Sequence, residues 1–144
     1  VHLGPAQRSR LKAFEDRLAR NPKDKEALLE AAGVYLEAGD LRMARILAGR
    51  VLEVDAKAHG ATNLSGLATL LLGDPAMAIF DLMQAQSQGS EAALVNLATL
   101  YWMYGDHERA RAAMQKVSDM RAVDFAAAGI HPKGVEMARQ LGFR

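Results

Sequence analysis

The side chains that could carry metal or acid–base chemistry are four histidines and a short acidic segment. The histidines lie far apart along the chain, at His2, His59, His107 and His131. No two of them have the i, i+4 spacing with which a helical motif such as H-E-x-x-H holds zinc. The sequence GDHE at residues 105–108 is expected in a tight turn between helices, where capping and solvation are the ordinary roles. These residues therefore predict no metal site.

Nucleophilic and phosphate-binding patterns are also missing from the sequence. Cysteine is absent, which excludes disulfides, thiolate catalysis and cysteine-based zinc sites. No serine lies in a G-x-S-x-G elbow, and no glycine-rich phosphate loop follows a strand pattern. Glu26, Glu30 and Glu37 fall near one face of a predicted helix, where a row of carboxylates is usually the solvated side. We therefore expect a protein that is not an enzyme and that uses neither a metal nor a cofactor.

The charge pattern argues against nucleic acid as a partner. The formal net charge of +1 gives no global attraction to a phosphate backbone or an anionic membrane. Residues 1–25 carry seven Lys and Arg, but acidic residues interleave with them, so a solvated basic helix face is favoured over a phosphate or lipid patch. The few aromatic residues are largely accounted for by helix packing, and little remains to stack on bases.

The most apolar stretch, LSGLATLLLGDPAMAIFDLM at residues 64–83, is too short to cross a membrane. Its uninterrupted apolar run ends at Gly73-Asp74-Pro75, well before the roughly 18 residues that a spanning helix needs. The chain has no initiator methionine and no signal-peptide pattern at Val1, so we interpret it as a processed product or an excised part of a longer protein. We expect a protein of the bacterial cytoplasm or periplasm without a transmembrane segment.

Three repeated turn signals organise the chain into helical hairpins. The segments YLEAGDLRMA (35–44), TLLLGDPAMA (69–78) and YWMYGDHERA (101–110) each place Gly-Asp after a helical apolar pattern. The glycine suits a helix C-terminus and the aspartate can cap the next helix. Successive glycines lie 34 and 32 residues apart, a period typical of stacked repeats. The predicted helices cover about residues 8–20, 25–38, 41–54, 58–72, 75–87, 91–104, 107–120 and 132–141.

These residues resemble the tetratricopeptide repeat family, whose 34-residue unit reads W-x2-L-G-x2-Y, then A-x3-F, then P. The first full copy matches at Leu28, Ala31, Ala32, Tyr35, Ala44 and Ala48, with Ala56 at the position of the proline. The third copy matches at Leu94, Leu97, Ala98, Tyr101, Ala110 and Met114. The second copy is irregular in its first helix, with Thr62, Ser65, Gly66 and Thr69 at the signature sites, and regular at Ala78 and Leu82.

The resemblance implies an all-α fold, a right-handed α-α superhelix of helix-turn-helix repeats closed by a C-terminal capping helix. We expect a single domain over residues 1–144, with a half repeat at 8–24, repeats at 25–58, 59–90 and 91–122, and a linker with the capping helix at 123–144. Pro132 is expected to start this last helix. Phe125 and Ile130 are the expected anchors of the linker before it.

In this family the first helix of each repeat lines a concave groove in which a peptide or a partner helix docks. Carried over position by position, the expected groove residues are Leu29, Leu36, Asn63, Leu67, Leu70, Leu71, Asn96, Thr99, Trp102 and Met103. Leu36, Leu70 and Trp102 are equivalent positions and should form an apolar row, which often marks an interaction site. Two alternatives stay open: the leucines belong to the core, or the last helix or a second copy of the chain covers the groove.

The resemblance implies a non-catalytic scaffold that binds an apolar peptide or amphipathic helix of another protein. The subfamily that clamps the C-terminal carboxylate of chaperones is not matched, because the groove sites that carry its Lys, Asn, Asn, Lys and Arg hold Leu29, Gly33, Leu64, Ala92 and Asn96 here. The alternative function is a self-association module, a homo-oligomer within a bacterial envelope, secretion or motility complex that assembles through the same apolar surface.

Overall fold

The computed structural model describes residues 3–118 and 129–143, and within these ranges the chain forms eight α-helices. Their bounds are α1 (Pro5–Arg20), α2 (Lys25–Ala38), α3 (Leu41–Val54), α4 (His59–Leu71), α5 (Pro75–Ser87), α6 (Glu91–Met103), α7 (His107–Met114) and α8 (Gly134–Gln140). From α1 to α7 each helix packs on the next, and α8 returns to pack on α6. The predicted all-α fold of consecutive helix pairs is confirmed.

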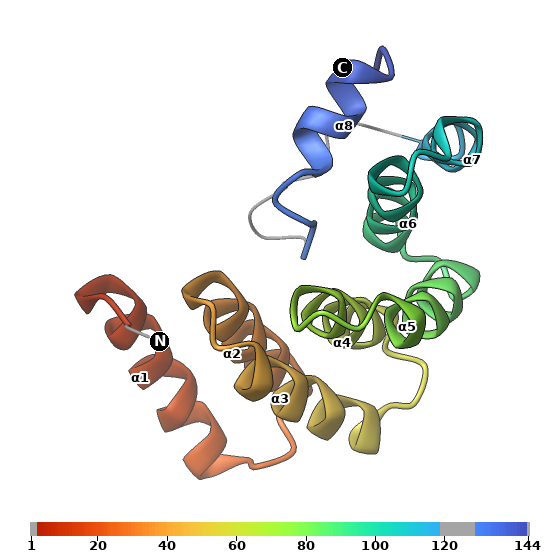
Figure 1. The fold of residues 1–144 in the computed structure, drawn as a ribbon. Coiled ribbons are helices and arrows are strands. Elements are labelled where there is room, and N and C mark those ends of the chain that lie inside the picture. Colours follow the sequence, from red (N-terminus) through yellow and green to blue (C-terminus); the bar gives the residue numbers. More distant parts are fainter. Residues whose placement is uncertain (1–2, 119–128, 144) are drawn as a thin grey trace.

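The helices follow an arc with an inner and an outer row. Figure 1 shows α2, α4 and α6 along the inner side and α3, α5 and α7 along the outer side. Helices of the inner row also contact one another, α2 with α4 and α4 with α6. Residues 129–133 and α8 lie on the inner side, above α4 and beside α6 (Figure 1). The inner row is therefore the surface that positions the candidate site.

The three Gly-Asp turns share one geometry. The glycines are left-handed, with φ of 85° at Gly39, 96° at Gly73 and 83° at Gly105. The following aspartate accepts a hydrogen bond from the main-chain N–H three residues later, at 3.1 to 3.2 Å in all three turns. Glycine lacks the Cβ that disfavours a positive φ, and the carboxylate satisfies a free N–H at the start of the next helix.

Three helix ends differ from the prediction. α1 begins at Pro5 rather than near residue 8, because the Gly4 N–H donates to Gln7 Oε1 (3.0 Å) and proline fits the first turn. α7 ends at Met114 rather than near residue 120. The prediction that Pro132 starts the last helix was wrong, because the Gly134 N–H donates to the His131 carbonyl (2.8 Å) and closes a turn with Pro132 inside it. Phe125 lies outside the described residues.

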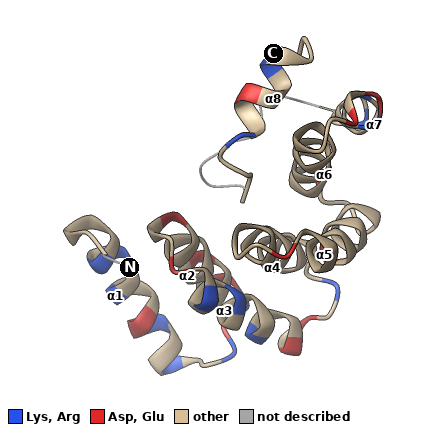
Figure 2. Ribbon diagram, in the orientation of Figure 1, with Lys and Arg blue, Asp and Glu red and all other residues tan. Residues whose placement is uncertain are grey.

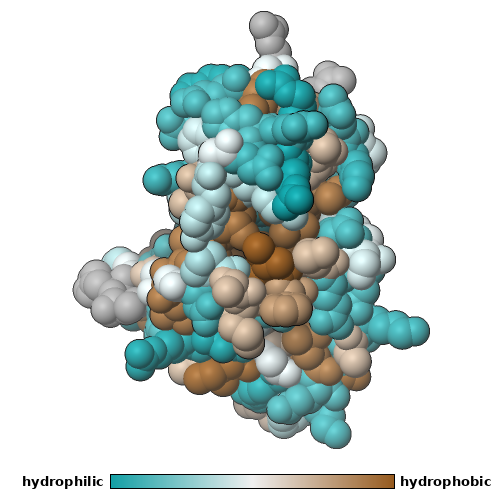
Figure 3. All heavy atoms as spheres, turned by 45° about the vertical axis from the view of Figure 1, so that its right-hand side comes forward, coloured by the Kyte–Doolittle hydropathy of each residue, from teal (hydrophilic) through white to brown (hydrophobic). Residues whose placement is uncertain are grey.

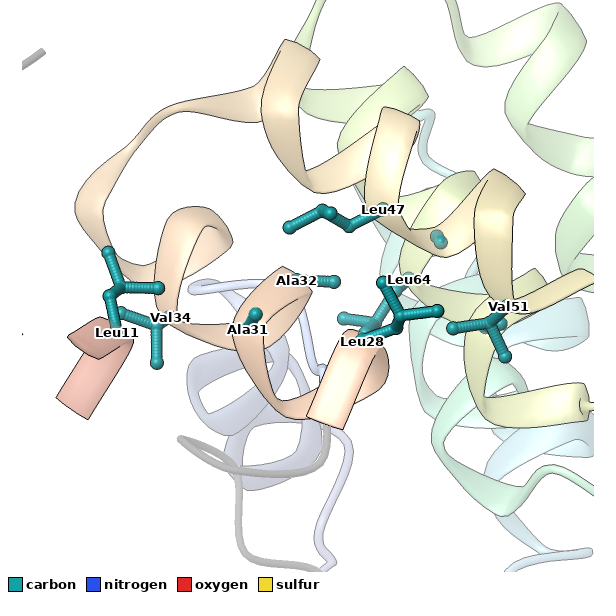
Figure 4. Close-up of a cluster of buried hydrophobic side chains, with 10 residues drawn as sticks. Leu11, Leu28, Ala31, Ala32, Val34, Leu47, Val51 and Leu64 are labelled. Atoms are coloured by element: carbon teal, nitrogen blue, oxygen red, sulfur yellow. The ribbon is translucent and has the colours of Figure 1, made fainter. Parts of the chain in front are cut away.

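Two main clusters of buried side chains hold the helices together. The first joins α1 to α4, with Leu28, Leu47, Val51 and Leu64 among its members, and small alanines such as Ala32 let the helices approach closely (Figure 4). The second joins α6, α7 and α8. The regular signature residues of the first and third repeats supply much of both clusters, as the resemblance predicts.

The irregular second repeat packs through its glycine. A Cβ added at Gly66 of α4 would lie 3.0 Å from Asp81 Cβ and 3.0 Å from Leu82 Cγ of α5. Carbon atoms this close are rare in proteins, so a side chain at position 66 would force Asp81 or Leu82 of α5 to shift by a few tenths of an ångström. The missing large residues of this repeat are thus compensated by a closer approach of its two helices.

We expect Gly66→Ala to lower the free energy of unfolding by roughly 1–2 kcal/mol, because overpacking costs more than the helical preference of alanine returns. Gly33→Ala is the matched control, because a Cβ at Gly33 of α2 meets nothing within 4 Å. This control is expected to raise the free energy of unfolding by about 0.5–1 kcal/mol. Urea denaturation followed by circular dichroism measures both values, and an equal gain for the two variants would contradict close packing at Gly66.

Candidate functional site

The ten expected groove residues lie along α2, α4 and α6 but differ in accessibility. Asn63, Leu67, Asn96 and Thr99 are buried, whereas Met103 is exposed. The remaining five are half-buried: Leu29, Leu36, Leu70, Leu71 and Trp102. The apolar row of equivalent positions is thus partly accessible, while the polar residues predicted to face the groove are covered.

The segment that precedes α8 covers these polar residues. Two asparagines bind this segment through its main chain. Asn63 Nδ2 and Asn96 Nδ2 both donate to the Gly129 carbonyl oxygen, at 3.0 and 2.9 Å. Asn96 Nδ2 also donates to Asn63 Oδ1 (2.8 Å), and Asn96 Oδ1 accepts from the His131 N–H (2.7 Å). The two asparagines lie 33 residues apart on neighbouring inner helices, α4 and α6, and the packing of these helices places their amides side by side.

Only glycine fits at position 129. Its φ is +70°, where side chains are disfavoured. A Cβ there would lie 2.8 Å from Leu64 Cδ2 and 3.0 Å from Asn63 Nδ2. The close approach brings the Gly129 carbonyl within reach of both amides, so the fit and the hydrogen bonds depend on the same missing side chain.

Apolar contacts continue the interface toward the C-terminus. Ile130, Met137, Ala138 and Leu141 are buried in one cluster with Val95 and Ala98 of α6, and Trp102 and Phe143 pack on its edge. Of the alternatives that the sequence left open, the structure places Leu67 in the core and puts the C-terminal segment over the inner face of α4 and α6. The role of the ten residues in binding a partner stays a prediction.

His131 is the buried ionisable group of this interface. Burial lowers the pKa of its imidazole, and the nearby positive charge of Lys133 lowers it further. The Lys133 N–H donates to His131 Nδ1 (3.0 Å), a bond that requires this nitrogen to be unprotonated. The docked segment therefore favours neutral histidine.

We expect the docking of this segment to weaken as the pH falls below about 6.5, because the released histidine then binds a proton that the docked one does not. His131→Asn keeps an acceptor for the Lys133 N–H and does not titrate. The measurement is the free energy of unfolding of both chains at about pH 7.5 and pH 5.5. Wild type should lose more stability than the variant, and equal losses would contradict a role for His131.

The charged residues of the first helices pair with each other. Arg17 lies 3.4 Å from Asp24 and from Glu30, and Arg10 lies 3.3 Å from Glu37. These ion pairs join the basic face of α1 to the acidic face of α2, as expected for a solvated helix surface. Figure 2 shows Lys and Arg on α1 and α3 and none on α4 or α5. Among the described residues no group of three or more His, Asp or Glu is placed to hold a metal ion.

An exposed apolar surface on the outer side was missed by the sequence analysis. Phe80 is 72% exposed, and Met77 and Met83 of the same helix, α5, are more than half exposed. Ile46 and Leu72 line a cleft of about 580 Å³ beside it together with Arg42, Arg45 and Ser65. Figure 3, which brings the right-hand side of Figure 1 forward, shows apolar atoms gathered in the middle of this face. The available signal was the i, i+3, i+6 spacing of three large apolar residues in a segment without Lys or Arg.

Within the described part of the chain, no helix combines the length and the apolar character needed to cross a membrane. No protein-family model matches the sequence, and no curated protein matches it either. Among solved structures, the fold is similar to that of the crystal structure of MamA, a tetratricopeptide-repeat protein. The TM-score is 0.64 at 18% sequence identity, and the similarity covers 99% of this chain and 83% of that chain. This likeness establishes the fold of consecutive helix pairs.

Proposed function

We propose that this chain, which has the fold of tetratricopeptide-repeat proteins, is a non-catalytic scaffold that binds a segment of another protein on its inner face. One observation carries the proposal: the inner face already binds an irregular stretch with a turn and a short helix, at residues 129–140. Asn63 and Asn96 satisfy main-chain groups of the stretch, and α6 buries the apolar side of the helix. Side chains arranged in this way can bind a peptide of another chain by the same means.

The accessible part of the proposed groove is apolar. Leu36, Leu70 and Trp102 lie at equivalent positions of the three inner helices, and Met103 is exposed beside the last of them. Large apolar and aromatic side chains are the usual anchors of protein interfaces. The proposed mechanism is burial of an apolar peptide or amphipathic helix along this row, with Asn63, Asn96 and Thr99 setting its register.

Site-specific photo-crosslinking of the full-length protein in its source cells tests this proposal. A photoreactive residue in place of Leu70 or Trp102 should form crosslinks to another polypeptide, whereas one in place of Ala19, exposed on α1, should not. Circular dichroism establishes that each labelled chain is folded. Folded chains that crosslink only within themselves, or equally from Ala19, would contradict binding at the inner face.

The second candidate function is self-association, and the exposed face of α5 favours it. Phe80, Met77 and Met83 form a row of large apolar side chains that the described part of the chain leaves open to solvent. Such a surface often marks a protein contact. Unlike the expected assembly through the groove, this association would use the outer side of the arc.

Sedimentation velocity over a dilution series distinguishes the two surfaces. A concentration-dependent dimer that is lost in Phe80→Glu and kept in Trp102→Glu would support assembly through α5. Loss in Trp102→Glu alone would assign the association to the inner face. A monomer at all concentrations would contradict self-association.

A further inference from the structure

We propose that residues 129–141 occupy the site on the inner face that a partner protein binds. The partner that displaces them supplies a glycine, an adjacent apolar residue and a short amphipathic helix. This inference rests on the proposed function, because it names the class of segment that the inner face binds. The occupant of the groove is thus defined by the chemistry of the segment now seated in it.

The polar contacts of the segment involve its main chain. The two asparagine amides bind the Gly129 carbonyl, and Asn96 Oδ1 accepts the His131 N–H. None of these hydrogen bonds involves a side chain of the segment. Another polypeptide with the same backbone conformation can therefore make all of them.

Selectivity for the bound segment comes from the lack of space for a side chain at position 129. Because a Cβ there would lie 2.8 Å from Leu64 Cδ2 and 3.0 Å from Asn63 Nδ2, a side chain would push the carbonyl away from both amides. The positive φ disfavours other residues independently. A competing segment must therefore place glycine between Leu64 and Asn63.

The rest of the segment requires only an apolar pattern. Ile130, Met137 and Leu141 are buried, with Ala138 next to Met137, whereas the other side of the helix is exposed. Apolar residues at i, i+1 and i+4 of a short helix reproduce this face. A partner with this pattern after its glycine would bury the same part of α6.

The segment can leave without opening the core of the first repeats. α8 spans seven residues, and an isolated helix of this length is not stable in water. The apolar contacts of Ile130 and α8 belong to the cluster of α6 to α8, whereas α1 to α4 are held by a separate cluster that Gly129 meets at Leu64. Displacement by a competing segment therefore exchanges one local set of contacts for an equivalent one.

Trp102 reports on this exchange, because it is the single tryptophan and packs on the cluster that holds the segment. The experiment uses the full chain carrying Gly129→Ala, which loosens its own segment, and two synthetic peptides. One peptide has the sequence of residues 129–143, and the other has the same sequence with alanine in place of Gly129. Neither peptide contains tryptophan, so the emission comes from the protein.

The native peptide should shift the Trp102 emission of this variant in a saturable way, and the alanine peptide should bind at least about tenfold more weakly. Wild-type chain should bind the native peptide more weakly than the variant does. Equal binding of the two peptides, or no binding of either, would overturn the inference. If Gly129→Ala fails to fold by circular dichroism, Gly134→Ala replaces it, because a Cβ there would lie 2.8 Å from Ile130 Cγ2.

Two further outcomes separate this inference from the proposed function. A crosslinked partner whose bound segment lacks glycine would keep the scaffold function and overturn the glycine requirement. Selective peptide binding without any crosslinked partner in cells would support the glycine site and contradict the scaffold function. A wild-type dimer that is lost in Gly129→Ala would show that the segment of a second copy is the occupant, which overturns a separate partner.

Discussion

Replacing Leu67 with glutamate is expected to abolish the cooperative unfolding transition of the chain. Leu67 lies in α4, and only 1% of its surface is exposed. A carboxylate there would be buried without a partner, at a cost of several kcal/mol, whereas a domain is stable by only about 5–15 kcal/mol. Leu67→Ala, which removes volume without adding charge, should still cost about 2–5 kcal/mol.

Thermal denaturation followed by circular dichroism measures both Leu67 variants. Leu70→Glu is the matched control, because Leu70 is three residues away on the same helix and only half-buried. The control should keep a cooperative transition, since its carboxylate can reach water. A folded Leu67→Glu chain with the melting temperature of wild type would show that Leu67 is a groove residue rather than a core residue.

Replacing Asn96 with leucine is expected to release the C-terminal segment from the inner face. The substitution keeps the size of the side chain but removes its donors to Gly129 and Asn63 and its acceptor for the His131 N–H. Buried polar groups that lose their partners cost about 1–3 kcal/mol each, so we expect a loss of roughly 2–4 kcal/mol in docking free energy.

Hydrogen exchange at the His131 amide measures this loss locally, and urea denaturation measures its effect on the whole chain. Thr62→Val is the control, because Thr62 Oγ1 donates to the Ala58 carbonyl (3.4 Å), away from the segment, and valine has the same shape. The control should leave His131 exchange nearly unchanged. Unchanged exchange in Asn96→Leu would contradict the role of the asparagine pair.

Local sequence signals were sufficient to predict the helix pairs. Each Gly-Asp pair ends one helix and caps the next through bonds between neighbouring residues, so its effect can be read without knowledge of the fold. The regular spacing of these Gly-Asp pairs along the chain then predicted that the helical hairpins stack one on the next. Pro132 was misplaced because proline fits both the first turn of a helix and the second position of a β-turn, and only the His131–Gly134 bond decides between them.

The coverage of the inner face by the C-terminal segment could not be predicted in the same way. Asn63 and Gly129 are 66 residues apart in sequence, and no periodic pattern connects them. Position in the repeat indicated the direction in which Asn63 and Asn96 point, but not that a later segment of the chain lies over them. The outer face of α5 was missed for a related reason: the spacing of Met77, Phe80 and Met83 is that of any packed helix face, and only the lack of a neighbour among the described residues makes it exposed.

The contact of Gly129 with Asn63 and Asn96 also has a mechanical consequence. In a stack of repeats, each helix contacts mainly its neighbours, so a small change between two repeats changes the curvature of the whole stack. The curvature depends on the distance between adjacent inner helices. Gly129 accepts hydrogen bonds from α4 and α6 at once, so it adds to the direct bond between Asn63 and Asn96 in holding these two helices at one distance. Loss of the hydrogen bonds to Gly129 should widen the arc of helices, and the radius of gyration from small-angle X-ray scattering should increase. Occupancy of the inner face would then set the shape of the whole molecule.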